Sequence, residues 1–394
     1  MKITYETLLI LHPTEIRKDK KHFIVEDTVT GEFFEMPAIC VDAIERIGQG
    51  DRLDIIEAEL KKKYPNEEVD ILDFANQLIE LGLVQSVDGE KMEVFAKNSE
   101  PGFQWLSPKL GRLFFNRFTA AGYAILFPAN ILLLVWNKDL FPHYKDIFVF
   151  DVMALNVLMW MALTFILVLI HEFGHVLAIR AHDLPARLEV GHRLFFVVFE
   201  TDMTAAWKLP ASKRNMLYLA GPSFDMLMLF LALAAQLLFP QSPALLQGIM
   251  GIVVLDVMLR VLYQCCVYMK TDFYFVLENV SGNYNLAENG KQYIKSWLSF
   301  GRKTALDGIF KGEERMARWY GIFYLMGVVV TVSLFFLYYI PQLLYICKKI
   351  PSGLIKPITS AGFWDALIIM LQICLMVGLL LYSWIKDYKR ALKG

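Results

Sequence analysis

The sequence predicts a polytopic α-helical membrane protein with a small α/β winged-helix-like domain at its N-terminus. Three observations lead to this fold class. Of the 394 residues, 56% are hydrophobic and 20% are charged, whereas soluble domains hold about 45–50% apolar and about 25% charged residues. Six apolar stretches are long enough to cross a bilayer as helices. The charge is unevenly divided, because residues 1–100 hold 12 basic and 22 acidic side chains although the whole chain has a net charge of −1.

The six apolar stretches each supply about the 20 residues that a transmembrane helix needs. They cover residues 118–136, 147–170 and onward, 217–239, 244–269, 320–340 and 361–385. Pro240 and Pro341 are expected to end the third and fifth helices. Basic residues gather beside the spans on one side, except for a loop with Lys348, Lys349 and Lys356. The positive-inside rule therefore predicts that both termini are cytoplasmic.

Ionisable side chains within a span are expensive and indicate function unless they are paired. Asp256 and Arg260 stand four residues apart on one helix, so a structural ion pair is expected between them. Asp151, Asp225 and Asp365 are further acidic residues in or beside the spans.

The second span continues into the segment HEFGH, which contains His171, Glu172 and His175. Histidines four residues apart on a helix face the same way, so both imidazoles can bind one metal ion. Two imidazoles and a carboxylate suit Zn²⁺, which lowers the pKa of bound water to about 7. Glu172 directly follows the first ligand and can reach that water. Unpaired histidine and glutamate would be costly beside an apolar helix, which favours a metal site over contacts with lipid headgroups.

A third metal ligand is required, and the sequence offers two candidates. Glu200 stands 25 residues after His175, in a segment that reads as a strand and a turn. Asp272 lies at the end of the fourth span, which the predicted topology places on the same side of the membrane as His171. Spacing and topology leave both residues open.

Four motifs occur in order over about residues 165–290: HEFGHVLA, TDMTAAWKLP, LAGPSFD and KTDFYFVLENVSGNYNL. In this order they resemble the site-2 protease family of intramembrane zinc metalloproteases, specifically its branch of peptide zinc metalloproteases. The resemblance implies a zinc metalloendopeptidase in which Asp272 is the third zinc ligand beside His171 and His175. It also implies that Glu172 is the general base and then protonates the leaving amine.

Two positions depart from the pattern of that family. Asp225 stands where many relatives have an asparagine that is thought to bind the substrate or the oxyanion, so Asp225 is a candidate substrate-binding residue whose role stays open. Phe273 follows Asp272 where many relatives have glycine. Residues 188–203 are rich in Phe and Val and are expected to form a hairpin. That hairpin packs on the active-site helix, offers an edge to a substrate strand, or does both.

In the N-terminal region, residues 22–27 and 32–35 flank the turn sequence TVTG and predict a β-hairpin. Three segments with apolar residues at helical spacing follow, and they end near Gly50, Pro65 and Gly82. A short strand closes the region. Two strands, three helices and a strand make a small winged-helix-like unit.

This layout resembles the PqqD-like peptide-recognition domains, or RiPP recognition elements, which capture the leader segments of ribosomally made precursor peptides. Capture is by addition of the leader to the third strand, alongside the third helix. The resemblance implies a leader-binding edge at residues 32–35, with Phe33 and Phe34 as candidate substrate-binding residues. A structural or dimerising winged helix is the alternative. The acidic charge argues against nucleic acid as a partner.

The predicted domains are a PqqD-like winged-helix domain for leader recognition (residues 1–90), a linker or interfacial segment (91–117) and a membrane-embedded zinc metalloprotease domain (118–394). We expect a multi-pass protein of the bacterial cytoplasmic membrane that hydrolyses a peptide bond in a precursor peptide during its maturation or export. The expected partners are that precursor peptide, the lipid bilayer, and other peptide-modification or export proteins.

Two other functions stay open. Regulated intramembrane proteolysis of a membrane-bound regulator would use the same site residues and differ only in its substrate. A non-catalytic peptide-binding receptor or immunity protein belongs to another class. The intact set of His171, Glu172, His175 and Asp272 counts against that last reading.

Overall fold

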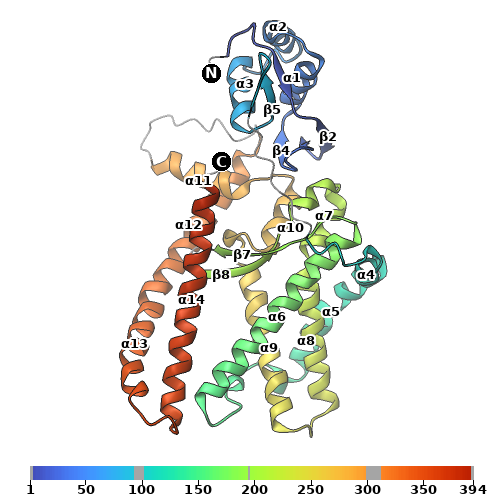
Figure 1. The fold of residues 1–394 in the computed structure, drawn as a ribbon. Coiled ribbons are helices and arrows are strands. Elements are labelled where there is room, and N and C mark those ends of the chain that lie inside the picture. Colours follow the sequence, from blue (N-terminus) through green and yellow to red (C-terminus); the bar gives the residue numbers. More distant parts are fainter. Residues whose placement is uncertain (1–2, 93–101, 194–195, 299–311, 392–394) are drawn as a thin grey trace. The chain divides into compact units, whose positions relative to one another are not determined.

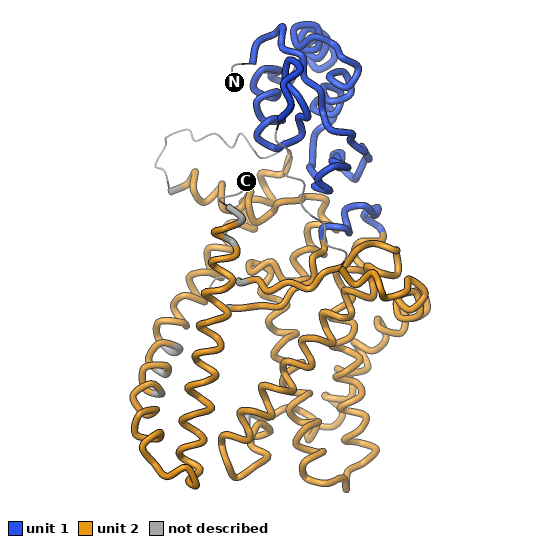
Figure 2. Tube along the Cα trace, in the orientation of Figure 1, with its two compact units in different colours: residues 1–101, 204–212, 394 blue, residues 102–203, 213–393 orange. Residues whose placement is uncertain are grey.

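The computed structural model describes residues 3–92, 102–193, 196–298 and 312–391. The chain separates into two compact units (Figure 2). One unit holds residues 1–101 with 204–212, and the other holds residues 102–203 with 213–393. Each unit is described by itself.

The N-terminal unit contains two small antiparallel sheets and three helices (Figure 1, blue). The elements are β1 (Leu9–Leu11), β2 (Thr14–Asp19), β3 (His22–Asp27), β4 (Phe33–Met36), α1 (Ala38–Gln49), α2 (Leu53–Lys63), α3 (Ile71–Glu80), β5 (Val84–Val87) and β6 (Glu90–Lys91). The strand orders are β1-β5-β6 and β2-β3-β4, so β4 is an edge strand of its sheet. Val25, Ile56 and Leu78 are fully buried in the core that the sheets and helices share.

The predicted hairpin and helices of this unit are confirmed, and local chemistry explains them. In the hairpin turn, the Asp27 carboxylate accepts a hydrogen bond from the Val29 N–H at 2.8 Å, and Gly31 adopts φ 73°, a conformation that favours glycine. Gly50 ends α1 in the left-handed conformation, and the Asp70 side chain caps α3. Strands β1, β2 and β6 are additional to the expected layout.

The second unit is built almost entirely of helices. They are α4 (Pro108–Phe114), α5 (Arg117–Trp136), α6 (Met153–Ala181), α7 (Ala211–Tyr218, which begins within the first unit), α8 (Ala220–Leu238), α9 (Ala244–Gln264), α10 (Asp272–Ser281), α11 (Leu286–Leu298), α12 (Glu314–Leu334), α13 (Ile340–Leu354) and α14 (Ala361–Ala391). Short 3-10 turns of this unit are η1 (Lys138–Leu140), η2 (Tyr144–Ile147) and η4 (Val267–Met269), whereas η3 (Thr204–Lys208) belongs to the first unit.

Six helical segments of the described chain are long and apolar enough to cross a membrane, which confirms the number of spans predicted from the sequence. They are Pro108–Trp136, Met153–Ala181, Ala220–Leu238, Ala244–Gln264, Glu314–Leu337 and Ala361–Lys386. Many large apolar side chains on these helices are exposed, as expected of surfaces that contact lipid. The described chain is therefore consistent with a multi-pass membrane protein.

The fifth span corrects one sequence-based expectation. Pro341 does not end the helix, because a π-helical turn (η5, Phe335–Tyr339) joins α12 to α13 and Pro341 lies in the first turn of α13. Pro341 has no N–H to donate to the preceding turn, and the π-helical turn lies directly before it. Lys348 and Lys349 consequently lie on a helix rather than in a loop.

Helix α6 is the centre of the packing, with α4, α8 and α9 against it. Gly174 makes the close approach of α6 and α8 possible, since a Cβ there would lie 2.8 Å from the Ala220 carbonyl oxygen on α8. Leu229, Leu233 and Val257 fill the core between α8 and α9. Helices α12, α13 and α14 stand together beside this group (Figure 1, orange to red).

The expected hairpin within residues 188–203 is confirmed by its two strands, with β7 (Leu188–Arg193) antiparallel to β8 (Phe196–Thr201). Strand β8 packs on α6, where the rings of Phe199 and Phe165 meet edge to face at 5.7 Å. Strand β7 lies toward α14, where Lys386 Nζ is 2.9 Å from a carboxylate oxygen of Glu189. The hairpin thus connects α6 to the last span.

Candidate metal centre

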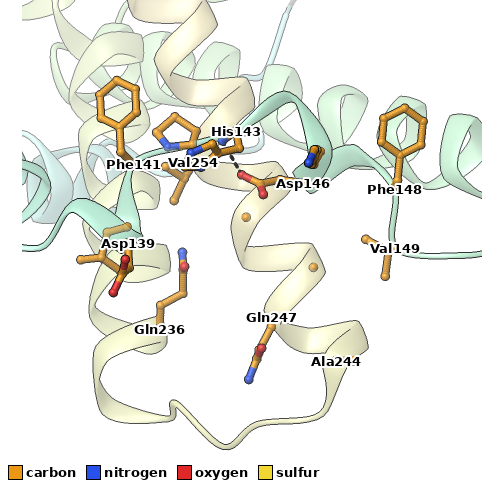
Figure 3. A pocket seen from close by; sticks show the side chains of 15 residues that line it. Asp139, Phe141, His143, Asp146, Phe148, Val149, Gln236, Ala244, Gln247 and Val254 are labelled. Carbon is orange, nitrogen blue, oxygen red and sulfur yellow. Dashed lines mark hydrogen bonds between the residues drawn. The ribbon is translucent and has the colours of Figure 1, made fainter.

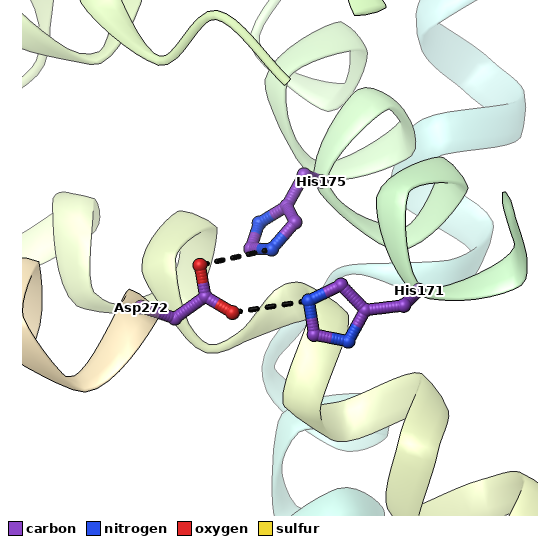
Figure 4. Close-up of side chains that lie close together, drawn as sticks. All are labelled: His171, His175 and Asp272. Carbon is purple, nitrogen blue, oxygen red and sulfur yellow. Dashed lines mark hydrogen bonds and ion pairs between the residues drawn. The ribbon is translucent and has the colours of Figure 1, made fainter. Parts of the chain in front are cut away.

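The structure brings His171, His175 and Asp272 together (Figure 4). One potential ligand atom from each residue lies within 4.8 Å of the other two. His171 Nε2 is 3.0 Å from Asp272 Oδ2, and His175 Nε2 is 3.4 Å from Asp272 Oδ1. The two histidines come from α6 and the aspartate from the first residue of α10, about a hundred residues further along the chain.

Both histidines are buried, at 5% and 3% exposed, where α6 meets the start of α8. Gly221 allows this arrangement, because a Cβ at that position would lie 2.4 Å from the Nε2 atoms of both His171 and His175. The glycine of the LAGPSFD motif therefore leaves room for the two imidazoles.

Asp272 is held from two sides by the last residue of α9. Gln264 donates from Nε2 to Asp272 Oδ2 at 2.7 Å and accepts from the Asp272 N–H at 3.0 Å. Burial raises the pKa of the Asp272 carboxyl, but attraction to His175 and the hydrogen bonds with both histidines outweigh it. The pKa of Asp272 consequently lies well below its usual range, so the group is a carboxylate at neutral pH.

The outer nitrogens of both imidazoles are occupied. His175 Nδ1 donates to the Leu217 carbonyl oxygen at 2.9 Å, and His171 Nδ1 is 2.7 Å from Asp225 Oδ2. Such partners keep a proton on Nδ1, so Nε2, which faces Asp272, is the nitrogen that would bind a metal. Two imidazole nitrogens and one carboxylate that converge in this way fit Zn²⁺ with an open fourth position.

Glu172 lies beside the three residues and lines a cavity of about 240 Å³ with His171 and Asp272. It is 8% exposed. Thr201, the last residue of β8, donates from its hydroxyl to Glu172 Oε2 at 2.8 Å. Val197, Val198 and Phe199 of the same strand also line the cavity. One strand of the hairpin thus faces the candidate site.

The predicted ion pair between Asp256 and Arg260 is confirmed, with Arg260 Nη2 donating to Asp256 Oδ2 at 2.6 Å. Arg260 also lies 3.4 Å from Asp225 Oδ1. Asp225 is 2% exposed and contacts His171 rather than open solvent. Asp365 has a structural role, because its carboxylate accepts a hydrogen bond from the Ala154 N–H in the first turn of α6.

The other candidates lie elsewhere. Glu200 lines the cavity from β8 but is outside the cluster formed by His171, His175 and Asp272. Phe33 and Phe34 are half-buried on the edge strand β4 of the N-terminal unit, where Phe34 packs partly against the core.

A second buried polar group follows Asp272 on α10. Glu278 accepts hydrogen bonds from the Tyr274 hydroxyl and from the Leu286 N–H. Burial raises the pKa of Glu278 to about 7, although these hydrogen bonds oppose the shift. The ENVSGNYNL part of the fourth motif, residues 278–286, therefore begins and ends with residues that are hydrogen-bonded to each other near the end of α10.

A polar cavity of about 400 Å³ lies away from these residues, between the α5–α6 connection and the α8–α9 hairpin (Figure 3). Asp139, His143, Gln236 and Gln247 are among its lining residues. None of the site residues predicted from the sequence lines it.

Sequence reasoning missed three partners of the site: Thr201, Gln264 and the Leu217 carbonyl. Gln264 carried a weak signal, because it is a polar residue at the end of an apolar span. Thr201 begins the TDMTAAWKLP motif, but nothing in the sequence links it to Glu172, and Leu217 carried no signal. Only the fold brings this strand end and this backbone carbonyl to α6.

Comparison of the chain with protein-family models, curated proteins and solved structures found no match.

Proposed function

We propose that this chain is an intramembrane zinc metallopeptidase that hydrolyses a peptide bond in a ribosomally made precursor peptide during its maturation or export. One observation carries the proposal. His171, His175 and Asp272 converge among membrane-spanning helices, and Glu172 lines the adjoining cavity. Nδ1 of each histidine is already bonded to Asp225 or to the Leu217 carbonyl, and Asp272 is bonded to Gln264.

His171, His175 and Asp272 would hold the zinc ion. When bound, zinc supplies Lewis-acid polarisation of a carbonyl and a water that is nucleophilic at neutral pH. Gln264 keeps Asp272 in place from two sides, and the Leu217 carbonyl keeps the His175 ring from turning. These contacts reduce the movement of the ligands during the reaction.

Glu172 is the general base of the proposed reaction. Its carboxylate would accept the proton of the attacking water and deliver it to the nitrogen of the leaving amine. The Thr201 hydroxyl orients this carboxylate by donating to one of its oxygens at 2.8 Å. The second oxygen remains to exchange the proton.

Strand β8 supports a binding mode for the substrate. It lines the cavity beside Glu172 and belongs to a two-stranded sheet in which β7 pairs with one of its edges. The opposite edge is the one proposed to pair with the substrate. A substrate segment that pairs with β8 would be extended, which exposes its peptide bond to the site. In the N-terminal unit, edge strand β4 with Phe33 and Phe34 is the proposed leader-binding edge, and holding the leader would raise the local concentration of the scissile segment.

The test is co-expression of the full chain with small precursor peptides encoded beside it, followed by mass spectrometry of the products. We expect a defined truncated peptide with the wild-type chain and intact peptide with Glu172→Gln, whose zinc content should be unchanged. Full cleavage by Glu172→Gln would contradict the proposed mechanism. Cleavage of a co-expressed membrane-bound regulator instead of the peptide would favour regulated intramembrane proteolysis. An intact peptide that co-purifies with a zinc-free wild-type chain would favour a receptor.

A further inference from the structure

Three charged side chains in the membrane-spanning helices form a network that ends on His171. Asp225 on α8 lies with Oδ2 2.7 Å from His171 Nδ1 and with Oδ1 3.4 Å from Arg260 Nη1. Arg260 on α9 also donates to Asp256 at 2.6 Å. The side chains of Asp225, Asp256 and Arg260 are only 2%, 8% and 12% exposed. The network is therefore almost entirely enclosed by protein.

The network returns to the helix that carries the histidines. Thr164 on α6 donates from its hydroxyl to Asp256 Oδ1 at 2.5 Å. Thr164 precedes His171 by seven residues, about two helical turns, so both side chains leave α6 on the same side. Side chains of α6, α8 and α9 are thus linked around one imidazole.

The charges of the network do not cancel. Arg260 and Asp256 already form an ion pair, so Asp225 is a second buried carboxylate. A buried carboxylate in a membrane costs free energy, and such residues are typically retained for a function. The three side chains sum to one negative charge next to His171. A divalent cation on Nε2 of His171 would lie across the ring from this charge and offset it. The arrangement favours a proton on Nδ1 and a metal on Nε2.

Resting on the proposed zinc site, we propose that Asp225 is a positioning residue that acts through His171. Arg260, which is itself paired with Asp256, lies beside the other oxygen of this carboxylate and favours its place against Nδ1 of the imidazole. Asp225 also borders an apolar cavity of about 370 Å³ lined by residues such as Phe127 and Met226. A substrate that enters this cavity would find Asp225 Oδ2 already bonded to His171 and Oδ1 within ion-pair distance of Arg260. The residue therefore serves the ligand rather than the substrate.

The test compares the zinc affinity of full-length variants by competition with a chelator. Asp225→Ala should bind zinc about 10–100-fold more weakly than the wild type, as found when a partner of a metal-bound histidine is removed. Asp225→Asn should recover part of this loss, because an amide oxygen still accepts a hydrogen bond from Nδ1. Asp365→Asn is the matched control, since Asp365 is also a carboxylate bonded to α6 but at its first turn. It should bind zinc as the wild type does.

A second measurement uses Co²⁺ in place of zinc. The visible absorption bands of bound Co²⁺ should shift in Asp225→Asn and stay unchanged in Asp365→Asn, because only Asp225 contacts a ligand. If Asp225→Ala does not fold, Asp225→Asn decides by affinity and spectrum. Wild-type affinity and an unshifted spectrum in Asp225→Asn, with a raised KM for the peptide, would overturn the inference and return Asp225 to substrate binding. A wild-type chain that binds no zinc would instead refute the proposed function.

Discussion

Replacement of Gly221 by alanine tests the geometry of the site most sharply. An added Cβ would lie 2.4 Å from Nε2 of both His171 and His175, whereas real Cβ contacts are essentially never below 3.0 Å. Either the imidazoles or the start of α8 must move by about 0.6 Å to reach that limit, and by about 1 Å to reach ordinary contact near 3.4 Å. Metal–ligand distances tolerate deviations of only about 0.2 Å.

We therefore expect Gly221→Ala to weaken zinc binding at least about 10–100-fold, which corresponds to about 1.4–2.7 kcal/mol. Chelator competition with purified full-length protein measures this loss. Gly122→Ala is the matched control, because Gly122 also lies on a membrane-spanning helix and a Cβ there meets no atom within 4 Å. The control should keep wild-type affinity. Equal zinc affinity in Gly221→Ala and Gly122→Ala would refute the reasoning.

Two further predictions concern the base and the support of the site. Thr201→Val removes the hydroxyl that donates to Glu172 and should lower kcat about tenfold with zinc content unchanged. Thr201→Ser keeps the hydroxyl and should keep the wild-type kcat. Equal kcat values in the wild type, Thr201→Val and Thr201→Ser would contradict this role. Glu278 has a folded-state pKa of about 7, above its ordinary 4.5, so the stability it contributes is complete below about pH 4.5 and is lost as the pH rises through about 7. The Tm of the wild type should fall between pH 5 and pH 8, and Glu278→Gln should reduce this fall; an unaltered pH dependence in that variant would show that another group is responsible.

Much of the membrane fold could be predicted because hydropathy is a local property. All six spans were expected near the positions where the structure has them. The exception at Pro341 arises from a π-helical turn, which depends on packing and leaves no clear mark in the sequence. In the N-terminal unit, β1 was missed because its partner β5 lies more than seventy residues away, so no local pattern records the pairing.

The site was predictable to the extent that its chemistry is repeated along a helix. The spacing of His171 and His175 places both imidazoles on one face of α6, whereas Asp272 reaches them only through the packing of α9 and α10. From the residues alone, Glu200 and Asp272 were equal candidates, and the resemblance to a known family favoured Asp272. The contact between Asp225 and His171 could not be foreseen, because it depends on how α6 and α8 cross at Gly174 and Gly221.

The zinc content of the purified full-length protein tests the central claim most directly. The account predicts about one zinc ion per chain in the wild type, in Glu172→Gln and in Glu200→Gln, and almost none in Asp272→Ala. Glu200→Gln is the matched control, because Glu200 lines the same cavity but stands outside the cluster of His171, His175 and Asp272. A wild-type chain without zinc, or zinc that persists in Asp272→Ala and is lost in Glu200→Gln, would contradict it.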